Sequence, residues 1–216
     1  MTLQARCNAA VAAALLALLP LVASAQNAQV QADKLAEVMM RMLPFGKILD
    51  DAAAANPEWP LQGKADKVEP AKLSCLRSEL STDGYRRSKR AQALEYVKAH
   101  PDRVDADLAL LNGGAASVFS DFINAGVNEA QTGKKVETTE VMKQMKAEQM
   151  LSFIDFITEP KHAPLRELVG IGEAFDPTKT PQQNSDAGKG VGTRLVLKLM
   201  LGAMTTCDVP PSTILE

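Results

Sequence analysis

The sequence predicts an all-α fold, and two observations carry this prediction. Leu35, Val38, Met39 and Met42 recur at the i, i+3, i+4, i+7 spacing of an amphipathic helix. No stretch combines alternating apolar residues with clustered β-branched residues, so strands are not expected. We therefore expect a single compact bundle of about seven to nine helices.

Proline, glycine and capping residues mark the boundaries of the other helices. Pro70 suits the first turn of one helix, and Pro101 ends the helix that runs to His100. Gly114 and Gly133 end two more. The expected helices span residues 47–55, 70–80, 85–100, 102–112, 115–131, 138–158, 164–169 and 191–206. The tail from residue 208 is expected to be extended.

The segment 176–190 is polar and rich in Pro, Gly, Asn and Asp, without apolar periodicity. It is therefore predicted to be a mobile loop. The helix that follows it, 191–206, is apolar around most of its circumference, with Arg194 and Lys198 as its only charged stripe. A helix of this kind usually lies in the middle of a bundle, so we expect the last helix to be central.

The first 25 residues have the composition of a secretory signal peptide. Arg6 precedes an apolar run, 9–22, and the small residues 23–25 follow it. The run is shorter than the roughly 20 residues that a bilayer requires. We expect cleavage after Ala25, a periplasmic location for a single domain at 26–216, and no transmembrane segment after cleavage.

The cysteines predict a disulfide bond. Cleavage would remove Cys7 and leave Cys75 and Cys207. In an oxidising compartment an even pair is expected to form a disulfide. The alternative, a redox-active thiol, lacks a C-x-x-C motif.

Composition argues against several classes of function. The formal net charge of −2 provides no basic excess for nucleic acid. The only histidines, His100 and His162, belong to no zinc-binding or serine-triad pattern. We expect no cofactor, no metal and no enzymatic activity.

Two segments, 119–123 and 153–157, share the pattern Phe-x-Asp-Phe-Ile. On a helix the phenylalanines and isoleucine share one arc, whereas Asp121 and Asp155 point away from it. We therefore expect buried phenylalanines and solvent-facing aspartates, rather than a pair of catalytic carboxylates. Their spacing equals the tetratricopeptide period, but the small-residue positions do not recur and there is no third copy.

Five residues are candidates for contact with a partner. Arg86, Arg87, Lys89 and Arg90 form the densest charge cluster, which suits either an acidic partner or a solvated helix face. Trp59, the only tryptophan, either anchors its turn-rich loop on the core or forms a binding hot spot.

The order of the helices resembles a family of bacterial periplasmic proteins described as a domain of unknown function. The resemblance rests on "ADKLAEVMMRMLPFGKILD" at 32–50 and on "TTEVMKQMKAEQMLSFIDFITEPKHAPLREL" at 138–168, which contains Phe153 and Phe156. The turn at 159–162 keeps the family's proline but lacks its usual glycine. This resemblance implies an all-helical periplasmic domain and supplies no catalytic residues. In organisation the chain is also similar to toxin-immunity proteins.

The sequence thus favours a periplasmic protein-binding domain, an immunity or inhibitor protein that neutralises a secreted antibacterial effector. The alternative is a cell-envelope enzyme or a small-ligand carrier with a cleft between its helices. A deep, polar-lined pocket would favour the alternative, and a surface rimmed by Trp59 and residues 86–90 would favour protein binding.

Overall fold

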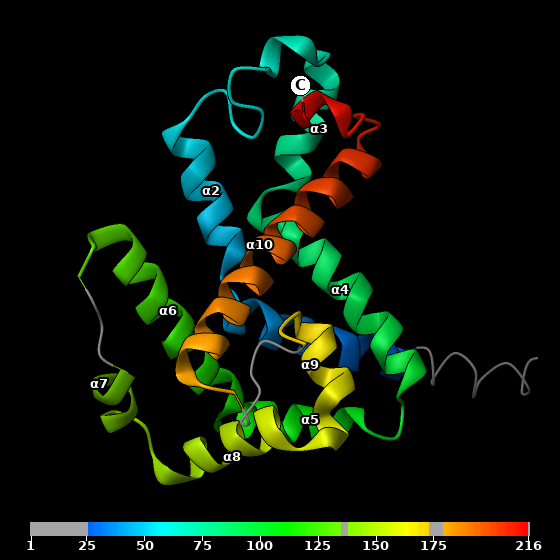
Figure 1. The fold of residues 1–216 in the computed structure, drawn as a ribbon. Helices are drawn as coiled ribbons and strands as arrows, with labels where there is room; N and C mark the ends of the chain where they lie inside the picture. The colour runs from blue at the N-terminus through cyan, green and yellow to red at the C-terminus, as the bar shows by residue number, and fades with distance from the viewer. Residues whose placement is uncertain (1–25, 135–137, 173–178, 216) are drawn as a thin grey trace, which may run out of the picture.

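The computed structural model describes residues 26–134, 138–172 and 179–215, and all regular structure within these ranges is helical (Figure 1). The predicted all-α class is therefore confirmed. The predicted signal peptide lies outside the described residues. Within those ranges, no helix combines the length and the apolar character needed to cross a membrane.

The elements follow one another through short connections. The first helix covers residues 26–42. The elements after it are α2 (Phe45–Ala55), η1 (Ala65–Lys67), α3 (Pro70–Glu79), α4 (Thr82–Ala99), α5 (Val104–Leu110), η2 (Leu111–Ala115), α6 (Ala116–Thr132), α7 (Thr138–Lys143), α8 (Ala147–Thr158), η3 (Pro160–His162), α9 (Ala163–Val169), α10 (Pro181–Thr206) and α11 (Ser212–Leu215).

Two clusters of buried apolar side chains hold these helices together. The larger cluster joins the first helix to α4, α5, α8 and α9, and Phe156 and Leu165 lie at its centre. The smaller cluster joins α3 to the end of α10 through Leu76 and Met204. In Figure 1, α10 crosses the middle of the molecule. Leu195, in the middle of α10, packs against the larger cluster, and Ala203 and Met204 near its C-terminal end belong to the smaller one.

The predicted disulfide is confirmed. Cys75 of α3 is bonded to Cys207 at the end of α10, across a sequence separation of 132 residues. Both half-cystines belong to the smaller cluster or pack against it. The bond therefore fixes the last long helix to the first half of the chain.

The start of α10 corrects the loop prediction. Residues 181–190 are helical, and residues 176–178 of the expected loop lie outside the described residues. The reason is a capping box: the Thr180 hydroxyl accepts from the Gln183 amide, and the Gln183 side chain accepts from the Thr180 amide. Pro181 at the first helical position supports the same start.

The last long helix is central in position, and among its side chains that the structure describes the buried ones lie near its C-terminal end. Ala203 and Met204 are buried, whereas Val196 and Leu197 are about half exposed. Some of the apolar residues that predicted a central helix therefore form a partly exposed apolar surface halfway along α10.

Two further boundaries differ from the predictions. The single helix expected at 138–158 divides into α7 and α8, because the backbone of Lys146 is extended and its amide donates to Gln149 Oε1 at 3.0 Å. The tail expected to be extended contains the short helix α11, in which the Thr213 amide donates to the Pro210 carbonyl.

A glycine allows the two Phe-x-Asp-Phe-Ile helices to meet. Gly114 in η2 has a φ of +139°, and a Cβ placed there would lie 2.4 Å from the backbone Cα of Gln149 in α8. Only glycine permits both this conformation and this close approach. The break predicted at Gly114 is therefore a kink inside a continuous helical segment.

The repeated aromatic residues pack against one another. The rings of Phe122 and Phe153 lie 5.6 Å apart, and Phe156 is fully buried. Phe119 is half-buried, as are Phe122 and Phe153, so only Phe156 meets the full expectation of burial. Asp121 is exposed as predicted, whereas Asp155 is partly buried and faces a histidine.

Candidate ligand-binding site

The charge cluster predicted for partner contact is largely neutralised within the protein. Arg86 forms an ion pair with Asp83 at 2.7 Å, and Arg87 forms one with Glu79 at 2.7 Å. Arg90 donates to both carboxylate oxygens of Asp33, at 2.7 and 2.8 Å. The hydrogen bond from Arg90 lowers the pKa of Asp33. The three arginines thus tie α4 to its neighbours and to its own first turn, as a solvated helix face does.

Lys89 does not belong to that exposed face. It is only 4% exposed, because helical spacing places it on the inner side of α4 between Tyr85 and Ala93. Helical spacing places Asp121 away from the apolar arc of its own helix. In the same way it places Lys89 on a different face of α4 from its arginine neighbours. This signal was available in the sequence.

Trp59 anchors its loop. The ring is half-buried against the smaller cluster. The Arg77 guanidinium donates to the Trp59 carbonyl at 3.0 Å and also to the carbonyl of Pro57. These contacts favour the core-anchoring role over the binding hot spot.

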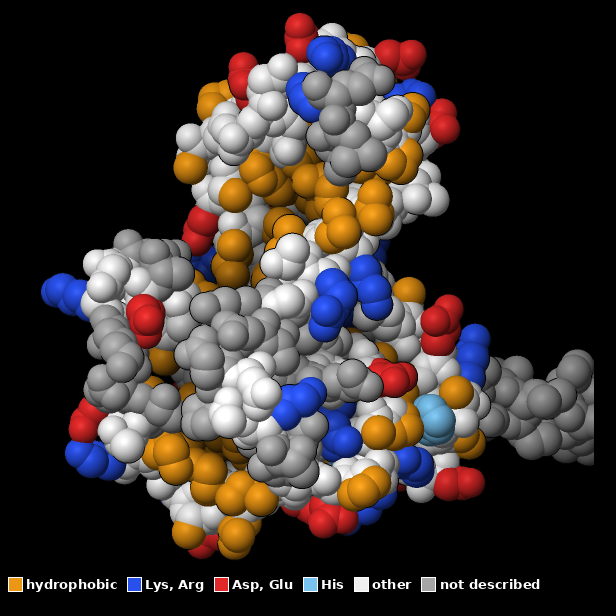
Figure 2. All heavy atoms as spheres, in the orientation of Figure 1, with side chains coloured by type: hydrophobic (Ala, Val, Ile, Leu, Met, Phe, Trp, Pro, Cys, Tyr) orange, Lys and Arg blue, Asp and Glu red, His pale blue; other side chains and the backbone are white. Residues whose placement is uncertain are grey.

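A cleft of about 670 Å³ lies between α4, α9 and α10, and Lys89 lines it. Its walls combine apolar and polar groups, as small-molecule sites usually do. Figure 2 shows hydrophobic side chains gathered along the waist of the molecule, with Lys and Arg side chains directly below them. The apolar lining comes from Phe45, Ala99, Pro164, Leu168, Leu195, Leu199 and Ala203.

Lys89 has no carboxylate partner in the part of the chain that the structure describes. Its Nζ donates to Gln92 Oε1 at 3.0 Å and lies 5.3 Å from the centre of the Tyr85 ring. Burial, with a smaller contribution from the positive charge of Lys198, lowers the pKa of Lys89 to about 8. The buried amine is therefore a cation held without a counter-charge.

Tyr85 adds a second buried polar group to the same wall. It is almost completely buried, and its hydroxyl has no hydrogen-bond partner among the described residues. Burial raises the pKa of Tyr85, so the hydroxyl stays protonated. Phe45 contacts the ring edge-on and fixes its orientation.

The remaining charged groups of the cleft lie at its rim. Lys198 and the carboxylates of Glu95 and Glu167 are exposed there, and Glu79 is already paired with Arg87. The inner end of the cleft is consequently positive, and its negative groups face water.

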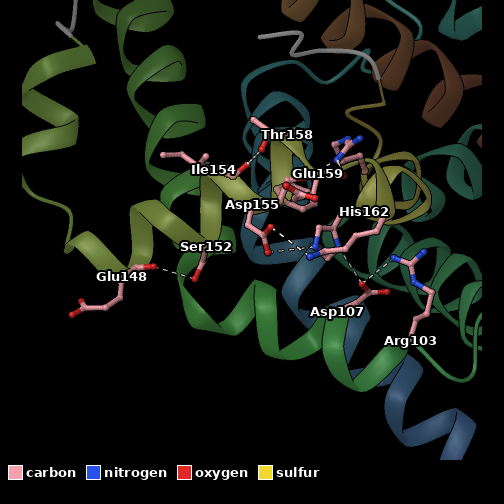
Figure 3. A network of polar contacts seen from close by, with 12 residues as sticks. Arg103, Asp107, Glu148, Ser152, Ile154, Asp155, Thr158, Glu159 and His162 are labelled. Atoms are coloured by element: carbon pink, nitrogen blue, oxygen red, sulfur yellow. Dashed lines mark hydrogen bonds and ion pairs between the residues drawn. The ribbon is translucent and has the colours of Figure 1, made fainter.

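A polar network surrounds the buried side chains of Asp107 and His162 (Figure 3). Tyr96, which lines the cleft, donates its hydroxyl to Asp107 Oδ2 at 2.6 Å. Asp107 also faces Arg103 at 3.4 Å and His162 Nδ1 at 3.6 Å, while His162 Nε2 lies 3.5 Å from Asp155. The histidine ring therefore stands between two carboxylates and connects α5, α8 and the start of α9.

This network positions a wall of the cleft and does not suit metal binding. In the ranges that the structure describes, no group of three or more His, Cys, Asp or Glu side chains is arranged to hold a metal ion. The Asp107 carboxylate is instead committed to Tyr96 and Arg103. Sequence reasoning missed Asp107, although Val104, Leu108 and Leu111 surround it at helical spacing.

The Tyr96 hydrogen bond predicts a stability difference between two similar substitutions. Tyr96→Phe is expected to lower the free energy of unfolding by about 2 kcal/mol, because the buried Asp107 loses a donor. Tyr85→Phe is the matched control and should cost less than Tyr96→Phe, because the Tyr85 hydroxyl has no partner to lose. Urea denaturation of both variants measures the difference, and equal losses would contradict this account of the network.

The chain matches no protein-family model, no curated protein and no solved structure.

Proposed function

We propose that the protein binds a small anionic ligand with an apolar body in the cleft between α4, α9 and α10. The observation that carries this proposal is Lys89, a buried amine with no carboxylate partner among the described residues. Holding an unpaired cation in a partly apolar site costs free energy, which an anionic ligand would offset. This function corresponds to the ligand-carrier alternative drawn from the sequence.

The composition of the cleft supports the same ligand class. Lys89 and Lys198 provide two positive charges. The Tyr85 hydroxyl is a neutral hydrogen-bond donor, because burial raises its pKa. The leucines of α9 and α10 provide apolar surface beside them. A carboxylate attached to an aromatic or aliphatic body matches this arrangement, and the disulfide is consistent with function in an oxidising compartment.

A single substitution tests the proposal. The probe is 4-(hydroxymethyl)benzoate, and its uncharged methyl ester serves as the control ligand. Lys89→Met is expected to weaken binding of the acid by about tenfold, because one charge-assisted hydrogen bond is lost. Titration followed by NMR measures the dissociation constant.

The control variant is Lys98→Met, which removes an exposed lysine from the same helix outside the cleft. It should bind the acid as the unmodified protein does. Equal binding of the acid and the ester, or equal affinity of the Lys89→Met variant, would overturn the proposal.

A second candidate, the protein-binding function favoured by the sequence, is supported by a different surface. Leu151 and Ile154 of α8 are 66% and 45% exposed, and Met142 of α7 is 45% exposed. Figure 2 shows hydrophobic side chains gathered over α8 at the lower left. Exposed apolar patches of this kind often mark protein interfaces. Gel filtration with secreted proteins encoded by neighbouring genes tests this candidate, and a stable complex would favour it.

A further inference from the structure

We infer that Lys89 is a nucleophilic amine that forms an imine with an aldehyde or ketone carrying a carboxylate. The inference rests on the proposed function, because it names the ligand class of the same cleft. It depends on the position of the amine at the inner end of the cleft and on the second amine, Lys198, that lines the same cleft.

The hydrogen bonding of Lys89 leaves its lone pair available. In the described residues its Nζ has one hydrogen-bond acceptor, Gln92 Oε1 at 3.0 Å. Gln92 is held in turn, since its amide donates to the Ser88 hydroxyl at 3.2 Å. One N–H bond of a neutral amine is thereby oriented, and among the described residues no carboxylate accepts from the amine and stabilises its protonated form.

The charge of the cleft favours the neutral amine that the chemistry requires. Only the unprotonated amine attacks a carbonyl carbon, and lysines become nucleophilic when they are desolvated beside another cation. Burial and Lys198 lower the pKa of Lys89 to about 8. About one molecule in ten is therefore unprotonated at pH 7, far more than for a lysine in water.

The reaction is balanced without a cofactor or a redox partner. The Lys89 nitrogen forms a bond to the carbonyl carbon, and proton transfer from nitrogen to oxygen gives a carbinolamine. The hydroxyl group then leaves with the remaining proton of the nitrogen as one molecule of water, and the nitrogen lone pair completes the carbon–nitrogen double bond. An oxo acid would lie in the opposite orientation to the unreactive acid, with its carboxylate facing Lys198, which lines the same cleft, and its carbonyl group facing Lys89.

A packing role for Lys89 is the competing account. Its ammonium group lies over the Tyr85 ring at 5.3 Å, a distance at which a cation–π attraction operates. This contact alone requires neither a cleft beside the amine nor a second lysine. The two accounts differ in one measurable property, the reactivity of Lys89 relative to other lysines.

Reductive trapping measures this reactivity. The full disulfide-bonded protein is treated with 4-formylbenzoate and cyanoborohydride near neutral pH, and modified lysines are located by peptide mapping. Labelling of Lys89 should exceed that of the exposed Lys98 on the order of tenfold, because burial lowers the pKa of Lys89 to about 8 and raises the neutral fraction of its amine. The Lys89→Met variant should lose this labelling, and Lys98→Met should keep it.

The role of Lys198 is tested with methyl 4-formylbenzoate, which lacks the negative charge. The unmodified protein should label faster with the acid than with the ester, and Lys198→Met should remove this preference. Equal labelling of Lys89 and Lys98 would overturn the inference.

The non-reactive 4-(hydroxymethyl)benzoate separates the two proposals. If it binds while 4-formylbenzoate leaves Lys89 unlabelled, imine formation is wrong and ligand binding stands. If neither compound binds, both proposals are wrong.

Discussion

Replacement of both Cys75 and Cys207 by alanine is expected to lower the free energy of unfolding by several kcal/mol. The bond closes a loop with a sequence separation of 132 residues, for which the chain-entropy model gives about 5 kcal/mol as an upper value. The native packing of α3 on α10 already includes Leu76 and Met204. The loss therefore acts mainly through the greater freedom of the unfolded chain. Urea denaturation without reductant measures it.

The control for this prediction is reduction of the unmodified protein. Dithiothreitol should lower its stability to that of the double variant and should leave the double variant unchanged. A loss below about 1 kcal/mol would contradict the prediction and would mean that the unfolded chain gains little freedom. The exposed ion pair of Lys72 with Asp208, beside the bond, should be retained in the folded double variant.

The elements that could be predicted are those whose boundaries are set by nearby residues. Pro70 starts α3, and Gly133 ends α6 in the left-handed conformation. The start of α10 differs from the prediction because its cap outweighs the polar composition of the segment. Thr180-Pro181-Gln182-Gln183 carries both a capping box and a proline at the first helical position, and both signals were present in the sequence.

The cleft could be predicted only in part. The inner face of α4 follows from spacing, since Tyr85, Lys89 and Tyr96 lie on one side of a helix. The residues on the opposite walls of the cleft depend on tertiary packing. Lys198 lies 109 positions after Lys89 in the sequence, and Pro164 belongs to a short helix. No local sequence pattern predicts that these residues line one cleft. The contact of His162 with Asp107 could not be predicted for the same reason.

The Lys89→Met variant is expected to be more stable than the unmodified protein near neutral pH, by about 3 kcal/mol. In the unfolded chain the pKa of Lys89 is close to its ordinary value of 10.5, and in the folded protein it is about 8. Each unit of pKa difference corresponds to about 1.4 kcal/mol. Methionine keeps most of the volume of the lysine side chain and removes the buried charge.

Because folding lowers the pKa of Lys89, the stability difference between the two proteins depends on pH. Between pH 8 and 10.5 the unfolded chain binds more protons at Lys89 than the folded protein does, so the stability of the unmodified protein rises with pH. The advantage of the Lys89→Met variant should therefore be largest below pH 8 and should disappear near pH 10.5. The raised pKa values of Tyr85 and Tyr96 lower the stability of both proteins above pH 10, and this effect cancels in the comparison.

Urea denaturation of both proteins across this pH range measures the difference, with Lys98→Met as the control that should show no such trend. A Lys89→Met variant that is less stable at every pH would mean that the contacts with Tyr85 and Gln92 outweigh the cost of burial. A variant that is more stable but no longer binds 4-(hydroxymethyl)benzoate would show that Lys89 both lowers the stability of the free protein and binds the ligand. The unpaired amine would then lower stability in the free protein because its counter-charge arrives with the ligand.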